Sequence, residues 1–204
     1  MRDLITRRLR DTQPPADPVK AALAKLPPDI AQAWFNSPLL SAAVLIPLIP
    51  RPGGMTMLLT RRAEHVKHHA GQISFPGGRT KTSDDGPRDT ALRETAEEIG
   101  VPPAQVTVIG YLEAYPVVTG YAVVPVVGIV DGDPPLRLDS SEVAEAVEVP
   151  LAFLRDENNV RPASRVYKGI EVETYEYLYG GHRIWGATAD MIKNFNEKAF
   201  KTNI

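Results

Sequence analysis

Three glutamates and one arginine gather in the ten residues ALRETAEEIG at positions 91–100. Because an α-helix turns by about 100° per residue, Glu94, Glu97 and Glu98 fall within an arc of about 100° on a helical wheel. The far side of the same wheel carries an apolar stripe made of Leu92, Ala96 and Ile99. The segment therefore predicts an amphipathic helix with one face packed in the protein and one strongly acidic face.

The acidic face lacks the basic residues that would stabilise it within the helix. Glu94 has like-charge neighbours at Glu97 and Glu98, each pair costing about 0.2 to 0.5 kcal/mol, and only Arg93 stands four residues from Glu97. One interpretation is a solvated helix surface, as for most charge runs. The other is a site for a hard divalent cation, which prefers oxygen ligands and completes its shell with water and substrate phosphates. The second interpretation predicts a phosphorylated substrate.

Other side chains give weaker chemical signals. His65 and His69 have the i,i+4 spacing of a zinc site, but no glutamate follows the first histidine as in a metalloprotease helix. Glu142 and Glu145 are candidates for a general base from a late loop. Strand aromatics that could stack on a base usually pack in the core instead, and Trp185 is also interpreted as a packing residue. The other aromatic residues considered are Tyr111, Tyr115 and Tyr121.

The elements that must position these residues can be read from the hydrophobic pattern. Short β-branched runs predict strands at 41–49, 55–62, 105–115, 121–130, 142–150, 164–167 and 172–179. Helices are expected at 87–100, 151–156 and 188–200, with Pro87 in the first turn and Gly100 as the stop of the acidic one. This mixed order predicts an α/β sandwich with a mixed β-sheet. Residues 1–40, punctuated by proline, are expected to form a helical extension that packs on a domain spanning 41–204.

Composition argues against several other functions. The 204 residues carry 23 basic and 25 acidic side chains, so the formal net charge of −2 gives no global attraction for nucleic acid. The absence of cysteine excludes disulfides, thiolate metal sites and thiol nucleophiles. The apolar runs are too short to span a bilayer, and the N-terminus lacks the apolar core of a secretory signal. We expect a cytoplasmic protein without membrane or nucleic-acid partners, and a homodimer is an open alternative.

The segment FPGGRTKTSDDGPRDTALRETAEEIGV, residues 75–101, resembles the signature of the Nudix hydrolases. That signature has a glycine and a spaced acidic residue before Arg-Glu-x-x-x-Glu-Glu-x-Gly and an aliphatic residue. The helical half matches in residue type at Arg93, Glu94, Glu97, Glu98, Gly100 and Val101. The front half departs, because only Asp84 matches the spaced glutamate and one extra residue precedes Arg93. We interpret Asp84 as a cap rather than as a metal ligand.

Two further motifs are similar to the coenzyme A pyrophosphatase branch of this family. LLTRRAEHVKHHAGQISFPGG, residues 58–78, looks like the segment that marks this branch, with matches at Arg62, Lys67, Gly71 and Phe75 to Gly78. HRIWGATADM, residues 182–191, is similar to the C-terminal stretch of the same branch. The resemblance covers about residues 41 to 195 and implies a Nudix-type α/β/α sandwich with a catalytic loop-helix-loop.

The resemblance also implies roles for individual residues. Metal, as Mg²⁺ or Mn²⁺, would be bound by the carboxylates of Glu94, Glu97 and Glu98 and by the carbonyl group of Gly78. Arg93 would complete the catalytic set by holding Glu97 in its ligand rotamer. The candidates for binding substrate phosphates, each of which could equally be a loop charge, are Arg62, Lys67 and Arg79.

The implied reaction is hydrolysis of the diphosphate of coenzyme A, or of its acyl or oxidised forms. The products would be 4′-phosphopantetheine and adenosine 3′,5′-bisphosphate. Two alternatives stay open. The substrate could be another small-molecule nucleoside diphosphate derivative, such as ADP-ribose or a dinucleotide, or the domain could be a non-catalytic ligand-sensing module.

Overall fold

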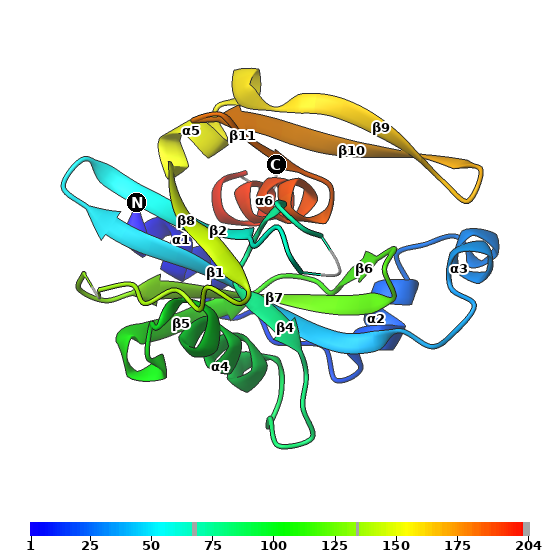
Figure 1. The fold of residues 1–204 in the computed structure, drawn as a ribbon, viewed down its shortest axis with the longest axis horizontal. Coiled ribbons are helices and arrows are strands. Elements are labelled where there is room, and N and C mark those ends of the chain that lie inside the picture. Colours follow the sequence, from blue (N-terminus) through cyan, green and yellow to red (C-terminus); the bar gives the residue numbers. More distant parts are fainter. Residues whose placement is uncertain (67–68, 134, 202–204) are drawn as a thin grey trace.

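The computed structural model describes residues 1–66, 69–133 and 135–201, and a mixed eight-stranded sheet forms its centre (Figure 1). The strands are β1 (Leu40–Arg51), β2 (Gly54–Arg62), β3 (Ile73–Ser74), β4 (Gly77–Arg79), β5 (Val106–Tyr111), β6 (Tyr115–Val117), β7 (Tyr121–Val130) and β8 (Val143–Pro150). Strands β1 and β7 run parallel, and the other pairs are antiparallel. Both central strands are almost continuously apolar and buried, as expected for strands covered on both faces.

Strand β1 changes partner along the edge opposite to β7. Ala42–Val44 pair with β4, whereas Leu48–Arg51 pair with β2. Between these two stretches, the amide of Leu45 donates to the carbonyl oxygen of Pro76 at 2.9 Å. Two different strands therefore share one edge of β1, and the sheet is split where they part.

Helices cover both faces of the sheet (Figure 1). They are α1 (Arg2–Leu9), α2 (Pro18–Leu23), α3 (Pro28–Trp34), α4 (Pro87–Ile99), α5 (Leu151–Arg155) and α6 (Ala187–Phe200). Helix α4 packs on β1, β4 and β7 on one face, while α1 and α6 contact each other on the other face. Leu92 and Ile99 of α4 belong to one core cluster, and Ile5 of α1 and Phe195 of α6 belong to another. This arrangement confirms the predicted α/β sandwich with a mixed sheet.

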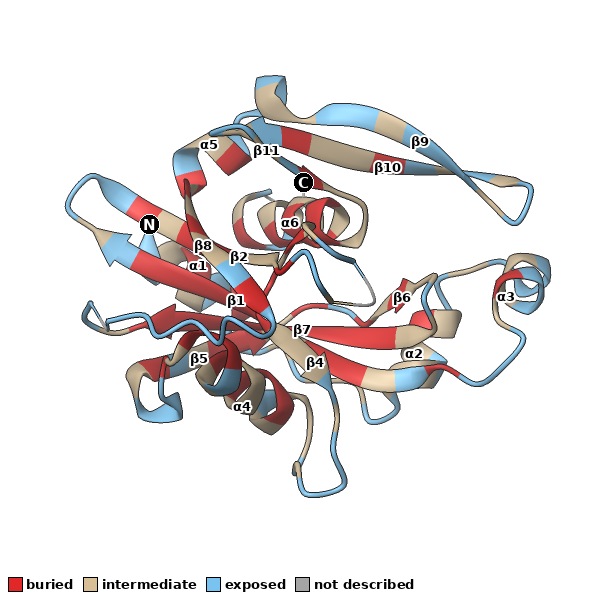
Figure 2. Cartoon of the chain, in the orientation of Figure 1, coloured by how far each residue is buried: buried red, intermediate tan, exposed pale blue. Residues whose placement is uncertain are grey.

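A second sheet of three antiparallel strands lies against α6. Its strands are β9 (Arg161–Tyr167), β10 (Ile170–Tyr179) and β11 (His182–Trp185). Tyr177 and Ile184 are fully buried in the same cluster as Phe195, whereas β9 is largely exposed (Figure 2). The hydroxyl of Tyr167 donates to the carbonyl oxygen of Val118 at 3.0 Å. This bond ties the end of β9 to the loop between β6 and β7.

The N-terminal helices pack closely on the rest of the chain. Ile5 and Leu9 of α1 and Ala22 of α2 are fully buried. Trp34, at the end of α3, meets Tyr167 edge-on with 5.8 Å between the ring centroids. The boundary between an extension at 1–40 and a domain at 41–204 stays a prediction.

Most predicted elements lie where the sequence indicates, including the helices expected at 87–100 and 188–200. The strand expected at 105–115 is two strands, β5 and β6, and the register of β5 shifts at Gly110. Strands β3, β4 and β11 were missed because two to four residues cannot display an alternating pattern. Within the described ranges, no helix has the length and apolar character needed to cross a membrane.

Candidate active site

Helix α4 carries the acidic residues, and it begins and ends at residues that favour helix termini. Pro87 occupies the first turn, and Gly100 ends the helix in the left-handed conformation with φ of +75°. Leu92 and Ile99 are buried as predicted, but Ala96 is only half-buried. The remaining apolar contact comes instead from Ala91 and Thr95. The helix is therefore rotated relative to the predicted orientation.

This rotation gives the three glutamates different surroundings. Glu97 is exposed and Glu94 is half-buried, whereas Glu98 is only 4% exposed. The prediction of a single acidic face opposite the packed one was wrong in this respect, because Glu98 lies at the edge of the packed face. The burial of the three carboxylates therefore increases from Glu97 to Glu94 to Glu98.

Arg93 binds the carboxylates of α4 rather than pointing into solvent. One of its terminal nitrogens donates to Glu94 and, at 3.2 Å, to Glu97. Its other terminal nitrogen donates to the carbonyl oxygen of Arg79 at 3.2 Å and to Asp84 at 2.8 Å. The expected contact with Glu97 is present, and Arg93 also orients the loop that precedes the helix.

Asp84 is the main partner of Arg93 and is not a helix cap. The guanidinium donates to both oxygens of this carboxylate, at 2.9 and 2.8 Å, in the bidentate geometry that arginine favours. Asp84 also accepts bonds from the amide of Lys81 and the hydroxyl of Thr90. The N-cap position of α4 is Gly86, which offers no side chain. The hydrogen bonds from Arg93 hold the pKa of Asp84 far below its ordinary value.

Glu98 has few partners for a buried carboxylate. Its Oε2 atom accepts a bond from the amide of Gly77 at 3.3 Å, and its Oε1 atom lies 3.9 Å from Arg62. Burial raises the pKa of Glu98 to about 8, with smaller contributions from Glu142 and Glu94, although Arg62 and the Gly77 amide act in the opposite direction. A buried group of this kind is stabilised by a nearby positive charge.

Two consecutive glycines let strand β4 approach both β1 and α4. A Cβ atom at Gly77 would lie 2.4 Å from the carbonyl oxygen of Ala43, and the backbone there has φ of +156°. A Cβ atom at Gly78 would lie 2.6 Å from the carboxyl group of Glu94. The backbone at Gly78 therefore comes as close to the acidic helix as any residue type permits.

The donor atoms at this point fit a hard divalent cation. The carboxylates of α4 and the carbonyl group of Gly78 offer only oxygen, which Mg²⁺ and Mn²⁺ prefer. In the part of the chain that the structure describes, no three acidic or histidine side chains are gathered closely enough to form a finished metal site. Glu94 and Glu97 contact Arg93 instead. A cation would therefore compete with Arg93 for these two carboxylates and would supply the charge that Glu98 lacks.

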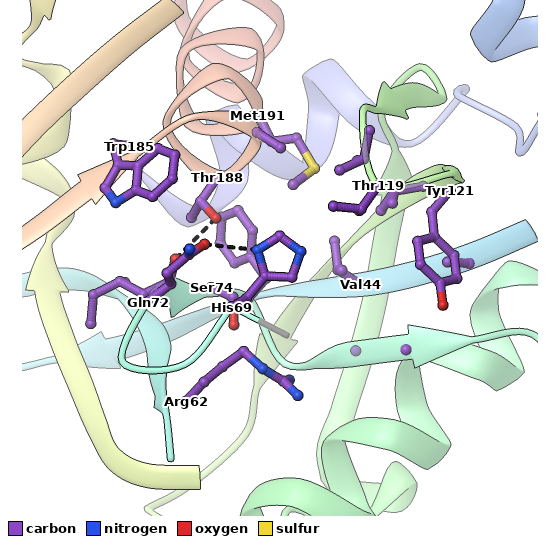
Figure 3. Close-up of a pocket in the computed structure, with 18 of the residues that line it drawn as sticks. Val44, Arg62, His69, Gln72, Ser74, Thr119, Tyr121, Trp185, Thr188 and Met191 are labelled. Atoms are coloured by element: carbon purple, nitrogen blue, oxygen red, sulfur yellow. Dashed lines mark hydrogen bonds between the residues drawn. The ribbon is translucent and has the colours of Figure 1, made fainter. Parts of the chain in front are cut away.

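A cleft of about 580 Å³ begins beside the two glycines (Figure 3). It lies between the main sheet, whose β1, β2, β3, β4, β6 and β7 contribute residues, and the start of α6 with β9 and β11. Apolar side chains such as Val44, Phe75 and Met191 form much of its surface. Its charged lining among the described residues consists of Arg62, Arg79 and Arg165, without any carboxylate. A cleft with this lining favours an elongated, anionic ligand.

The predicted substrate-binding residues have different outcomes. Arg62 and Arg79 line the cleft on the side of α4. The side chain of Arg62 is about one-quarter exposed, and its Nε atom is buried without a hydrogen-bond partner in the described chain. Lys67 lies outside the described residues.

The weaker candidates form no zinc site with the residues that the structure describes. His65 lies in a turn and His69 in a bend, and neither is helical. His65 contacts the Ser141 carbonyl oxygen, and His69 contacts the Gln72 side chain. Glu145 is bonded to Arg61 at 3.0 Å. The negative charge of Glu142, by contrast, helps to raise the pKa of Glu98.

Sequence reasoning missed the opposite wall of the cleft. Trp185 lines the cleft, so its interpretation as a packing residue was incomplete, and Tyr121 also reaches the lining. Arg165 comes from β9, a strand with no motif of its own. The only available signal for this wall was the similarity of residues 182–191 to a known motif.

Comparisons with known proteins agree with this geometry. The sequence model of the NUDIX domain matches residues 39–168. The uncharacterized Nudix hydrolase NudL of Escherichia coli is 41% identical over 154 residues, which cover 74% of this chain and 79% of NudL. Among solved structures, DR0079 from Deinococcus radiodurans has a TM-score of 0.50 at 11% identity, covering 79% of this chain and 83% of DR0079, and so shows the fold. The chain therefore belongs to the Nudix hydrolase family and is a pyrophosphohydrolase.

Proposed function

We propose that this Nudix hydrolase cleaves the diphosphate of coenzyme A, or of its acyl or oxidised forms. The products are 4′-phosphopantetheine and adenosine 3′,5′-bisphosphate. The observation that carries the proposal is the position of residues 58–78, the segment similar to the coenzyme A pyrophosphatase branch. Eight of its residues line the cleft, and its last two, Gly77 and Gly78, meet the acidic helix.

Nudix hydrolases act with divalent metal ions, and we propose that Mg²⁺ or Mn²⁺ serves here. The groups that would hold the ion are the carboxylates of Glu94, Glu97 and Glu98 and the carbonyl group of Gly78. When bound, such an ion neutralises the diphosphate and makes a water molecule a better nucleophile. Arg93 orients Glu94 and Glu97 through its hydrogen bonds to both.

The remaining residues of the cleft bind and orient the substrate. Arg62 and Arg79 are on the side of the acidic helix, where their charges would offset those of the diphosphate. Lys67 is a further candidate from the sequence. We propose Glu142 rather than Glu145 as the general base. The negative charge of Glu142 helps to raise the pKa of Glu98, whereas Glu145 is paired with Arg61. Replacing each by glutamine compares the two, and a larger loss of kcat in Glu145→Gln would contradict this choice.

Product analysis in ¹⁸O-labelled water tests the reaction. The enzyme is incubated with Mg²⁺ and either coenzyme A or ADP-ribose, and mass spectrometry identifies the products and the labelled phosphate. We expect 4′-phosphopantetheine and adenosine 3′,5′-bisphosphate, with label in only one of them. Cleavage of ADP-ribose without any turnover of coenzyme A would show that the substrate assignment is wrong while the Nudix chemistry stands.

A further inference from the structure

Arg165 and Trp185 form a stacked pair on the wall of the cleft that belongs to the second sheet. The guanidinium carbon of Arg165, on β9, lies 3.6 Å from the centroid of the Trp185 ring, on β11. Both residues line the cleft. Stacking on an aromatic face holds the guanidinium in place and leaves the N–H groups in its plane free to donate. The pair therefore presents a fixed set of hydrogen-bond donors.

The charge of Arg165 is not neutralised within the described part of the chain. No carboxylate lies within ion-pair distance of it, and its side chain makes no hydrogen bond there. Arg183, which also approaches the Trp185 ring, is bonded to Glu176 at 2.7 Å. Two arginines thus meet the same tryptophan, and among the described residues Arg183 has a carboxylate partner whereas Arg165 has none.

The arginines of the cleft are divided between its two sides. Arg62 and Arg79 come from β2 and β4, next to the acidic helix, and Arg165 comes from β9. Figure 3 shows Trp185 and Arg62 on opposite sides of the cavity. A diphosphate bound beside α4 would be served by Arg62 and Arg79, so Arg165 is available for a second anionic group.

We infer that Arg165, held by Trp185, binds a phosphate monoester of the substrate that is separate from the diphosphate. This inference rests on the proposed function for the position of the diphosphate. It narrows the substrate class to nucleoside diphosphate derivatives that carry an additional phosphate. Arg165 is then a specificity-determining residue, and Trp185 is the residue that positions it.

Substrates that differ only in this phosphate test the inference. We compare kcat/KM for coenzyme A and dephospho-coenzyme A in the native enzyme, Arg165→Ala and the control Arg161→Ala. Arg161 is exposed on the same strand and does not line the cleft. We expect Arg165→Ala to raise KM for coenzyme A about tenfold, with kcat and the values for dephospho-coenzyme A unchanged. If Arg165→Ala leaves the ratio of kcat/KM for the two substrates unchanged, or lowers kcat/KM equally for both, the inference is overturned.

The positioning role of Trp185 has its own test. Trp185→Ala should lose the preference for coenzyme A over dephospho-coenzyme A. Trp185→Phe retains a ring on which the guanidinium can stack, so it should preserve most of that preference. If both variants behave like the native enzyme, Trp185 does not position Arg165. A purely structural role would instead lower activity toward the two substrates alike.

Binding measurements separate this inference from the proposed function. Calorimetry without metal compares adenosine 3′,5′-bisphosphate with adenosine 5′-monophosphate, so it needs no turnover. An Arg165-dependent preference for the bisphosphate supports the inference even if coenzyme A is not hydrolysed. Binding of both nucleotides with no effect of Arg165→Ala contradicts it even if coenzyme A is hydrolysed.

Discussion

The charged groups beside the two ends of the cleft are held in place by different means. On the side of α4, carboxylates are kept in place by Arg93, which bonds to Glu94, Glu97 and Asp84. On the side of the second sheet, the charge is that of Arg165, which is kept in place by an aromatic ring. The first side has an internal counter-charge that a metal ion would replace. On the second side, Arg165 has no counter-charge among the described residues, and the phosphate inferred above would supply it.

Under the proposed function, this difference would separate catalysis from substrate recognition within one cleft. The residues that would act on the diphosphate lie on a packed helix, where their rotamers are restricted by burial and ion pairs. The residue inferred to select the substrate lies on an exposed strand. We therefore expect changes near α4 to reduce kcat and changes near β9 to alter preference between substrates.

The largest effect is expected from Glu98→Gln. Glutamine keeps the shape of this buried side chain but cannot serve as an anionic metal ligand, so metal binding weakens and kcat falls. A loss of about 4 kcal/mol in transition-state stabilisation corresponds to about a thousandfold in rate. Calorimetry with Mn²⁺ and steady-state kinetics measure the two effects, with the exposed Glu171→Gln as control. Full hydrolysis by Glu98→Gln would remove the basis for the metal site.

Arg93→Lys should have the next largest effect. Lysine cannot make the bidentate bond to Asp84 while contacting Glu94 and Glu97, so the carboxylates lose their orientation. We expect kcat to fall by about 10- to 100-fold. The ratio of activities toward coenzyme A and dephospho-coenzyme A should not change. A changed ratio would mean that the two sides of the cleft are coupled.

The variant Asp190→Ala tests the side of the cleft formed by α6 and the second sheet. Asp190, on α6, accepts bonds from the hydroxyl of Tyr115, from the hydroxyl of Thr174 at 2.9 Å and from the amide of Tyr175 at 3.2 Å. Removing the carboxylate leaves these three donors without their acceptor and removes the hydrogen bonds between α6 and β10. We expect the free energy of unfolding to fall by about 3 kcal/mol. Denaturant titration measures this loss.

The matched variant Asp190→Asn retains an acceptor oxygen and should lose less stability than Asp190→Ala. Under folding conditions, Asp190→Ala should weaken the preference for the additional phosphate more than it lowers kcat. The reverse order of these effects would contradict the division of roles between the two sides.

The smallest effect is expected at Glu113, which does not line the cleft. Bonds from Lys198 and Lys25 lower the pKa of Glu113 from 4.5 to about 2. Because the folded pKa is lowered, the stabilisation is present above about pH 4.5 and is lost as the pH falls toward 2. Salt screens this half-exposed group, so Glu113→Gln should cost less than about 1 kcal/mol at neutral pH. The unfolding free energies of the two proteins should differ at pH 7, differ less at pH 3 and coincide only as the pH approaches about 2. The activity at neutral pH should not change.

The side of the cleft formed by α4 could be predicted from the sequence because its signals are local. Pro87, Gly100 and the helical spacing of the acids lie within one short segment. The burial of Glu98 could not be predicted in the same way, because it depends on Gly77 from β4 and Arg62 from β2. A helical wheel gives relative directions on a helix, but the packing partner sets the absolute rotation.

The other side of the cleft depends on pairing between distant residues. Arg165 and Trp185 meet because β9 and β11 both pair with β10, and neither strand's sequence reveals that register. The role of Asp84 was also missed for this reason. Its bond to Arg93 requires the loop before α4 to fold back along the helix.

The parallel pairing of β1 with β7 has a consequence for folding kinetics. Leu40 pairs with Tyr121, so about eighty residues, including all of α4, lie between these partners. Parallel pairs of such wide separation close slowly, because a long loop must lose its entropy first. Helix α4 rests on both strands. During synthesis the acidic helix therefore leaves the ribosome before β7, one of the strands on which it packs. The carboxylates proposed to bind metal reach their final positions only when β7 pairs with β1.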